Sequence, residues 1–322
     1  MFAKLGFPRA LALAGLTLVV AVPDNASAAP PTLGCGSVVT KSVTLQADLL
    51  NCPGDGLIVG AAGITIDLHG HRIEGAVDVG IPVTPGSVGI RNAGYPRVRI
   101  EDTTTDSIPV TYGGVGWIGG FEVGILITDA SRNTILNVVN FDGLRLERSD
   151  RATIRASELE NVDLTCIPLT STAGLYLIDS DRATIRGNEV QLGGLGIVLI
   201  RSHNNILQGN AVAGVGSDGN NCSGITLLDA DGNRLVGNDT SQNGGDGIFV
   251  DAASQRTVID GNYAEFNFDD AIDVENKTTT ILNTKSVYSR DLGIEAVPGV
   301  TASGNVAANN GNPLQCLNVV CT

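Results

Sequence analysis

Features that the sequence lacks narrow the classes of protein to which it can belong. Its six cysteines include no Cys-x-x-Cys spacing, so zinc-ribbon and thioredoxin-like sites have little support. No segment repeats apolar residues every 3.6 residues over the length of a helix, and leucine-rich and WD-type signatures are missing. The three histidines show no spacing that supports Ser-His-Asp catalysis. These absences disfavour a helical protein and leave short strands as the expected structure.

The first residues have the pattern of a secretory signal peptide. Lys4 and Arg9 precede an apolar run over 10–22, and Ala26-Ser27-Ala28 supplies a small-x-small cleavage site. We expect cleavage after Ala28, so that residues 1–28 are a signal peptide. No later apolar run is long enough for a membrane-spanning helix. The sequence therefore predicts a secreted protein, extracellular or periplasmic, without a membrane anchor.

The charge of the chain is strongly negative. It has 34 acidic and 20 basic residues and a net charge of −14, which becomes −15 without the signal peptide because that segment holds two basic residues and one acidic residue. Such a chain repels nucleic acid and anionic membrane surfaces, so neither is an expected partner. Cations or neutral polymers are the expected ligands. A charge that only keeps the protein soluble is the alternative.

All six cysteines lie outside the signal peptide, and an even number in a secreted chain predicts disulfide bonds. Nearness in sequence, and the need to seal both ends of a repeat structure, favour two of the pairs. The two remaining cysteines lie in long inserted loops. The predicted pairs are Cys35–Cys52, Cys316–Cys321 and Cys166–Cys222.

A repeat dominates the sequence. Four copies of Gly-x-x-x begin at Gly174, Gly196, Gly224 and Gly247. In the first three copies an apolar residue follows 11 positions after the glycine and a Gly-Asn pair 13 positions after it, and the fourth copy has one extra residue. Weaker copies extend in both directions. Within each copy apolar residues alternate over three to five positions, which is the period of a β-strand.

Short strands at a fixed period, separated by Gly and Asn corners, predict a solenoid. We expect a single all-β right-handed parallel β-helix of about 10–12 rungs, stacked at the ~4.8 Å spacing of paired strands. The asparagines of the Gly-Asn pairs should form a ladder of amide hydrogen bonds between rungs (Asn188, Asn210, Asn238, Asn262 and Asn305). The predicted divisions are a cap with the first strands over 29–62, the β-helix over 63–307 and a disulfide-closed tail over 308–322.

From Ile64 to about Val306 the chain resembles the pectin-lyase-like right-handed β-helix superfamily. The Gly-Ile-x-Leu…Ile-x-Gly-Asn rungs and the opening segment 64–71 carry the resemblance. It implies the fold and a secreted repeat protein, but it implies little about activity, because that superfamily includes polysaccharide lyases, polygalacturonases, alginate epimerases and tailspikes. Asn267-Phe268-Asp269-Asp270 is similar to two polygalacturonase elements, but the Gly-His-Gly and Arg-Ile-Lys elements are missing.

The strand alternation predicts which side chains face outward. Positions two and four after each leading glycine point out, and in the middle rungs these are apolar, including Tyr176, Ile178, Ile200 and Leu228. An exposed apolar column implies a ligand, a partner chain or a covering loop. Tyr176, Phe249 and Trp117 are the candidate sugar-stacking residues, although Trp117 in its inserted loop is favoured as a packing residue.

The outward column turns acidic toward the C-terminus. Asp251, Asp273, Glu275 and Glu295 should project from one sheet and cluster with Asp246, Asp269 or Asp270. Carboxylates this close either raise one another's pKa or capture a cation such as Ca²⁺. The candidate metal ligands are Asp251, Asp273, Glu275 and Glu295, and the candidate catalytic residues are Asp251, Asp270, Asp273 and Glu275. A solvated acidic patch, partly neutralised by basic neighbours, is the alternative.

These observations predict a secreted β-helix protein that binds a polysaccharide or other glycan along its exposed face. Whether it also processes the polymer stays open; an enzyme would be a polysaccharide lyase or glycoside hydrolase. No cofactor is required by the sequence, with Ca²⁺ the one candidate. A non-catalytic adhesin or scaffold that self-associates into a homo-oligomer through the exposed apolar face is the alternative. The three histidines, His69, His71 and His203, are expected in cap and turn positions.

Overall fold

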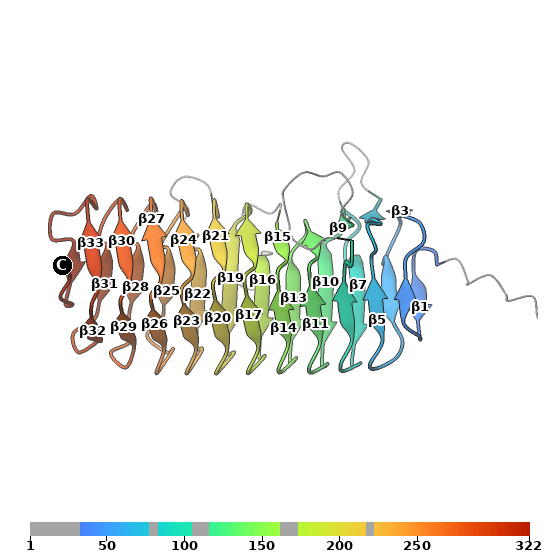
Figure 1. The fold of residues 1–322 in the computed structure, drawn as a ribbon, viewed down its shortest axis with the longest axis horizontal. Helices are drawn as coiled ribbons and strands as arrows, with labels where there is room; N and C mark the ends of the chain where they lie inside the picture. Colours follow the sequence, from blue (N-terminus) through green and yellow to red (C-terminus); the bar gives the residue numbers. More distant parts are fainter. Residues whose placement is uncertain (1–32, 77–82, 105–115, 162–172, 217–221) are drawn as a thin grey trace, which may run out of the picture. The chain divides into compact units, whose positions relative to one another are not determined.

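The computed structural model describes residues 33–76, 83–104, 116–161, 173–216 and 222–322. The regular structure in these ranges is β-strand, and the strands form three parallel sheets, here named A, B and C (Figure 1). Within the described ranges there is no helix with the length and apolar character needed to cross a membrane.

Sheet A has twelve strands. In order they are β1 (Ser37–Val39), β4 (Leu57–Val59), β7 (Val88–Ala93), β10 (Val123–Thr128), β13 (Leu144–Glu147), β16 (Ala173–Ile178), β19 (Leu195–Ile200), β22 (Ile225–Leu228), β25 (Ile248–Val250), β28 (Ile272–Val274), β31 (Ile294–Ala296) and β34 (Cys316–Leu317).

Sheet B has eleven strands. In order they are β2 (Val43–Thr44), β5 (Thr65–Asp67), β8 (Arg99–Glu101), β11 (Thr134–Leu136), β14 (Thr153–Arg155), β17 (Thr184–Arg186), β20 (Ile206–Gln208), β23 (Arg234–Val236), β26 (Val258–Asp260), β29 (Thr280–Leu282) and β32 (Thr301–Ser303).

Sheet C also has eleven strands. In order they are β3 (Leu49–Cys52), β6 (Ile73–Gly75), β9 (Trp117–Gly119), β12 (Val139–Asn140), β15 (Glu158–Glu160), β18 (Glu189–Gln191), β21 (Ala211–Ala213), β24 (Asp239–Ser241), β27 (Tyr263–Glu265), β30 (Lys285–Val287) and β33 (Val306–Ala308).

Each turn of the chain contributes one strand to each sheet in the same order, so every third strand pairs in parallel. The predicted right-handed parallel β-helix and its number of rungs are therefore confirmed. Strands from Ser37 onward already belong to the three sheets, and β34 pairs with β31, so the solenoid extends beyond residues 63–307 at both ends.

Stacked apolar side chains fill the interior. Leu175, Ile197, Ile225, Ile248 and Ile272 are successive register partners in sheet A, and each is 0% exposed. Full burial of one such side chain contributes roughly 1.5–3 kcal/mol, and the same stacking recurs in all three sheets. This repeated burial explains why the alternation in the sequence locates the core.

Close packing between rungs requires the leading glycines. A Cβ atom at Gly196 would lie 2.2 Å from the carbonyl oxygen of Gly224 and 2.6 Å from Cγ1 of Val212. Any larger residue would push consecutive rungs apart. In the four strong copies, the leading glycine is therefore a packing requirement of the solenoid, because a Cβ atom at each would lie within 3.4 Å of a carbonyl oxygen.

The predicted asparagine ladder is present. Asn188, Asn210 and Asn238 each donate from Nδ2 to the side-chain oxygen of the next asparagine at 2.9 Å, and the run ends at Asn262. Thr284 occupies the following rung and donates its backbone N–H to Asn305 Oδ1 at 3.0 Å. These buried amides satisfy one another and the backbone, so they serve the fold.

Disulfide bonds close both ends of the described chain. Cys35 bonds Cys52 with Cα atoms 5.3 Å apart, and Cys316 bonds Cys321 with Cα atoms 6.4 Å apart, as predicted. The third predicted pair, Cys166–Cys222, includes a residue outside the described ranges and stays a prediction.

Candidate functional site

The C-terminal rungs of sheet A present a column of outward side chains that changes from aromatic to acidic. Phe249 in β25, Asp273 in β28 and Glu295 in β31 are successive register partners. Their strand neighbours Ile272 and Ile294 are fully buried, which fixes these carboxylates on the outer face. The predicted projection of Asp273 and Glu295 from one sheet is confirmed.

Three further aspartates converge on this column from the corner between sheets C and A. One carboxylate oxygen from each of Asp246, Asp269 and Asp270 lies within 4.8 Å of the other two. Asp246 accepts hydrogen bonds from the backbone N–H of Asp270 at 3.2 Å and from the hydroxyl of Ser223 at 3.2 Å. Together with Asp273 and Glu295, these three residues are named the carboxylate cluster.

Burial and mutual repulsion hold protons on the cluster. Burial, with added repulsion from Asp246 and Glu295, raises the pKa of Asp273 to about 7. Burial and the Asp269 charge raise the pKa of Asp246 to about 6. The pKa of Asp270 is raised as well, by burial and then by a side-chain hydrogen bond to Glu295. At neutral pH the cluster therefore holds both protonated and ionised carboxyl groups.

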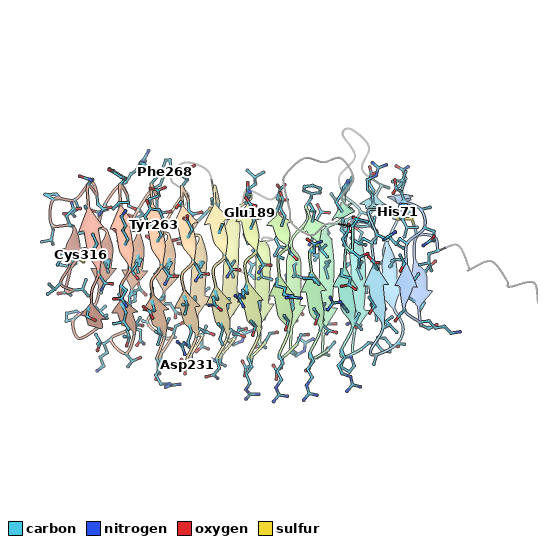
Figure 2. The ribbon with its side chains drawn as sticks, in the orientation of Figure 1. His71, Glu189, Asp231, Tyr263, Phe268 and Cys316 are labelled. Atoms are coloured by element: carbon cyan, nitrogen blue, oxygen red, sulfur yellow. A yellow bond between two sulfur atoms is a disulfide. The ribbon has the colours of Figure 1, made fainter. Side chains whose placement is uncertain are left out.

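No ion pair among the described residues neutralises the carboxylate cluster. Arg290 places its guanidinium 4.0 Å from the ring centre of Phe268, which lies at the edge of its rung (Figure 2). Arg256 binds Asp231 at 2.9 Å instead. Uncompensated carboxylates on an outer face are costly for stability, which makes the cluster a candidate for chemistry.

Asp251 does not join the cluster, contrary to the prediction. Its Oδ1 accepts from the backbone N–H and the hydroxyl of Ser254, at 2.8 and 2.6 Å, and both its oxygens lie 3.2 Å from the N–H of Asp229. Asp251 therefore closes a turn. Glu275 is exposed and lies one position beyond β28. Its negative charge contributes to the raised pKa of Asp273.

The expectation of an exposed apolar column is wrong. Tyr176, Ile178, Val198 and Ile200 are 0–6% exposed and form a second apolar cluster on the outer side of sheet A, with Leu228 packed against it. Tyr176 is thus not available to stack on a sugar. The alternative of a scaffold that self-associates through an exposed apolar face is weakened, because these apolar side chains are buried.

The other two aromatic candidates lie on different sheets. Trp117 in β9 packs edge to face against Phe141, with ring centres 5.5 Å apart, and carries Arg72 over its ring at 5.7 Å. It is a packing residue on sheet C. Phe249 is half-buried and is the aromatic residue next to Asp273.

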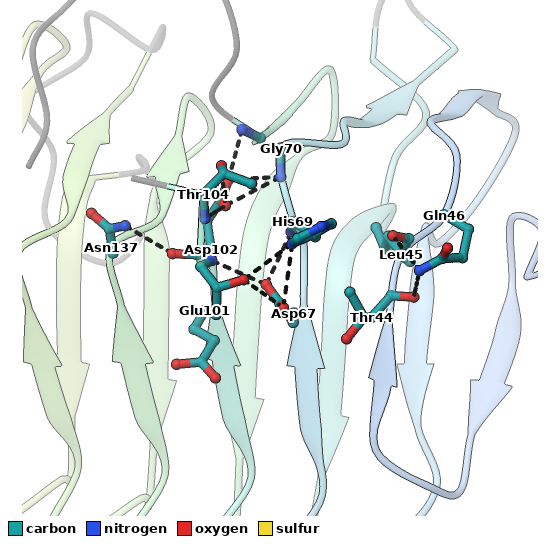
Figure 3. A network of polar contacts seen from close by, with 12 residues as sticks. Thr44, Leu45, Gln46, Asp67, His69, Gly70, Glu101, Asp102, Thr104 and Asn137 are labelled. Atoms are coloured by element: carbon teal, nitrogen blue, oxygen red, sulfur yellow. Dashed lines mark hydrogen bonds and ion pairs between the residues drawn. The ribbon is translucent and has the colours of Figure 1, made fainter. Parts of the chain in front are cut away.

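The histidines near the N-terminal end belong to a structural network. Asp67 Oδ1 accepts from the backbone N–H groups of His69 and Thr103, and Asp102 accepts from Gly70 (Figure 3). His71 contacts Asp48 at 3.1 Å. The carboxylates of Asp67 and Asp102 accept hydrogen bonds from backbone N–H groups at the corners of their rungs, which supports the expected cap role. Their oxygens are engaged in these bonds, so this network is a poor candidate for a metal site.

A second group of carboxylates, of which Glu158 is buried and Glu160 and Glu189 are half-buried, lies on sheet C, and the repeat pattern alone does not single it out. Glu158 is 2% exposed, and burial with repulsion from Glu160 and Glu189 raises its pKa to about 7. Glu158 and Glu189 are register partners in β15 and β18. Glu158 and Glu189 are 31 residues apart in the sequence, and so are the core residues Ile154 and Ile185. An alignment of the two rungs on their isoleucines would therefore have predicted that the two glutamates are neighbours.

A shallow hollow of about 210 Å³ lies over β7, β10 and β13 on sheet A. Arg91 and Arg145 line it, and they pair with Asp55 and Glu147 at 2.6 Å each. Because its charges are already paired, this hollow is a weaker candidate than the carboxylate cluster.

The sequence pattern of the right-handed β-helix region family matches residues 123–285. Among solved structures, the Dettilon tailspike protein is 17% identical with a TM-score of 0.61, over 85% of this chain and 60% of the tailspike chain. A point variant of the periplasmic alginate epimerase AlgG is 14% identical with a TM-score of 0.52, over 80% and 60%. The A-module of Azotobacter vinelandii mannuronan C-5 epimerase AlgE4 is 12% identical with a TM-score of 0.50, over 86% and 81%.

At these identities the similarity concerns the fold alone. The chain spans about 60% of the length of the tailspike and AlgG structures. No curated protein sequence matches it.

Proposed function

We propose that this chain, which belongs to the right-handed β-helix family, binds a neutral polysaccharide over the carboxylate cluster and hydrolyses it there. The position of Asp273 on the outer face of sheet A is the observation that supports the proposal. It faces outward between Phe249 and Glu295, half-buried, and its pKa of about 7 keeps a proton available at neutral pH.

Hydrolysis of a glycosidic bond needs an acid on one side and a carboxylate on the other. Asp273 protonates the leaving oxygen as the bond from that oxygen to the anomeric carbon breaks. Asp269, which is exposed, is the carboxylate that faces the developing positive charge. Water adds to the anomeric carbon, and its proton returns to the carboxylates. Asp270 is 4% exposed and cannot touch a polymer, so it acts as a positioning residue.

The class of polymer follows from charge and from Phe249. A sugar ring stacked on Phe249 reaches Asp273 on the next rung, roughly 4.8 Å away. A uronate polymer would meet unpaired carboxylates and be repelled, so a neutral polymer fits this face better. The two epimerases with similar folds are named for alginate and for mannuronan, which supports a polysaccharide as the ligand class.

Ca²⁺ binding by the same cluster is a second candidate. The three oxygens of Asp246, Asp269 and Asp270 within 4.8 Å of one another suit the oxygen coordination of Ca²⁺. Ca²⁺ must displace the protons, so stabilisation by millimolar Ca²⁺ over Mg²⁺ should be larger at pH 8 than at pH 5. Equal melting temperatures with Ca²⁺ and EDTA at pH 8 would exclude the cation.

Secretion into an oxidising compartment is part of the proposal. The pattern of residues 1–28 and the two disulfide bonds at the ends of the described chain support it. Detection of the protein outside the cytoplasm, with the first 28 residues removed, is the test.

The proposed hydrolysis is tested with a panel of neutral and acidic polysaccharides, each with Ca²⁺ or EDTA. We expect new reducing ends from a neutral polymer, unchanged by EDTA and lowered at least ~100-fold in Asp273→Asn. Glu275→Gln, which removes an exposed carboxylate one position beyond β28, is the matched control and should keep most of the activity. Unsaturated products, equal activity of Asp273→Asn, or binding to no polymer would each reject the proposal.

A further inference from the structure

Sheet B carries a group of arginines that the proposed function does not use. The seven-residue sequence Ser-Asp-Arg-Ala-Thr-Ile-Arg occurs twice, over 149–155 and 180–186. In the fold the two copies lie on adjacent rungs, where Arg155 in β14 is the register partner of Arg186 in β17. Arg151 and Arg182 occupy the preceding corner on the same two rungs.

The fold does not require these arginines. In both copies the serine, alanine and isoleucine are buried, whereas all four arginines are exposed. The next rung has Asn204 and Gln208 at the positions of Arg182 and Arg186, and it keeps the same register. Solenoid geometry therefore explains the repeated core residues and leaves the arginines unexplained.

The arrangement of the arginines is regular. Arg132 lies one rung before Arg151 and two rungs before Arg182, in the same corner column. The backbone N–H of each arginine donates to a carbonyl oxygen in the corner of the next rung; the acceptors are Asp150, Asp181 and His203. Neighbours in a column are ~4.8 Å apart, and the two columns are separated by four residues, roughly 13 Å. Outward threonines lie between the columns. We name these five residues the arginine patch: Arg132, Arg151, Arg155, Arg182 and Arg186.

The arginine patch has no ion partner within the described chain. Asp150 and Asp181 lie beside the corner arginines, but each directs an oxygen to a backbone N–H of the next rung, at 2.9 and 2.7 Å. Five positive charges against two negative charges leave this face basic in a chain whose net charge is −14. By contrast, Arg148 and Arg201 pair with Asp129 and Asp179.

From this face we infer that the arginine patch binds an acidic polysaccharide, through carboxylate or sulfate groups spaced along its chain. Guanidinium groups bind such planar or tetrahedral anions with two parallel hydrogen bonds, which the rigid fork of arginine favours over lysine. Columns that run along the solenoid offer repeated contacts to a linear polymer. The site is on a different sheet from the carboxylate cluster, and it does not depend on the proposed hydrolysis.

Other polyanions fit the surface less well. The two copies contain no aromatic side chain on which a nucleic acid base could stack. They also present no exposed apolar residue to insert into a membrane. Repulsion by the carboxylate cluster is weak at this distance: β17 and β28 are four rungs apart, roughly 19 Å, about two Debye lengths at physiological salt.

The test measures binding of polygalacturonate and dextran sulfate, with neutral dextran, duplex DNA and anionic vesicles as comparisons, from 50 to 300 mM salt. Arg155→Gln/Arg186→Gln removes two charges from the patch. Arg148→Gln/Arg201→Gln removes the same charge from paired, exposed positions and is the matched control. We expect the patch variant to lose at least ~10-fold in affinity for the acidic polysaccharides and to lower the salt slope by about one to two. The control should change affinity less than about threefold.

Three results would overturn the inference. They are no binding of either acidic polysaccharide at 50 mM salt, an equal loss in both variants, and tighter binding of DNA or vesicles than of acidic polysaccharide. Circular dichroism of each variant checks that the β-helix is intact.

Discussion

Replacing Asp273 with asparagine should stabilise the protein at alkaline pH and leave it unchanged in acid. Burial raises the pKa of Asp273 from 3.8 to about 7, so the folded state keeps a proton that the unfolded chain releases above about pH 4. The free energy of unfolding therefore falls as the pH rises through that window, and it stays lowered above pH 7. Asparagine carries no charge at any pH and removes this loss.

The size of the effect can be bounded. A rise from 3.8 to about 7 corresponds to at most ~4 kcal/mol for an isolated group. Asp273 is only half-buried, and the cluster shares its protons, so solvent screening and coupling reduce that figure. We expect a gain of ~1–2 kcal/mol at pH 9, or roughly 2–4 °C in Tm.

Thermal unfolding followed by far-ultraviolet circular dichroism measures this at pH 3.5 and pH 9, in the wild type, Asp273→Asn and Glu275→Gln. Glu275→Gln controls for the loss of one exposed negative charge and should gain less than ~0.5 kcal/mol. If Asp273→Asn gains nothing at pH 9, or gains as much at pH 3.5, the carboxyl is not held protonated by its surroundings.

Three further predictions concern the fold. Asn210→Ala should cost about 2–3 kcal/mol, because it removes the acceptor of the Asn188 backbone N–H and side-chain amide and the side-chain donor to the carbonyl of Ile185; denaturation with urea measures the loss, and a loss below ~0.5 kcal/mol would contradict the ladder. Removal of the Cys35–Cys52 bond by Cys→Ser substitution should lower the free energy of unfolding by about 3 kcal/mol, because the bond closes a loop with a sequence separation of 17. The loss should appear as a lower Tm, and an unchanged Tm would contradict this stabilising role. Peptide mapping without reduction should recover Cys166 joined to Cys222, and either cysteine found with another partner refutes the pairing.

The fold could be predicted because solenoid packing repeats the same requirement in every rung. Each leading glycine meets the backbone of the next rung, and each inward isoleucine stacks on its equivalent, so the period of the sequence is also the period of the structure. The same register correctly placed Asp273 and Glu295 on the outer face. Asparagine ladders and terminal disulfides followed from the same logic.

Side-chain surroundings could not be predicted from register. The alternation correctly turns Tyr176 and Ile200 outward, but an outward residue is exposed only if no other segment covers it, and here both are buried. Asp251 occupies the predicted outward position of its rung, but its carboxylate accepts hydrogen bonds from Ser254 in a local turn and does not join the cluster. Short-range hydrogen bonds and covering segments do not follow the repeat, so the repeat carries no information about them.

The proposed hydrolysis depends on a proton that Asp273 holds at neutral pH on the outer face of sheet A. Titration of the side-chain carboxyl carbons by ¹³C NMR measures this directly, with Asp273→Asn used to assign its signal. The predicted result is a pKa near 7 for Asp273 and near 6 for Asp246. A pKa for Asp273 below about 5, within the ordinary range of an aspartate, would mean that Asp273 is ionised at neutral pH and would remove the acid on which the proposed hydrolysis depends.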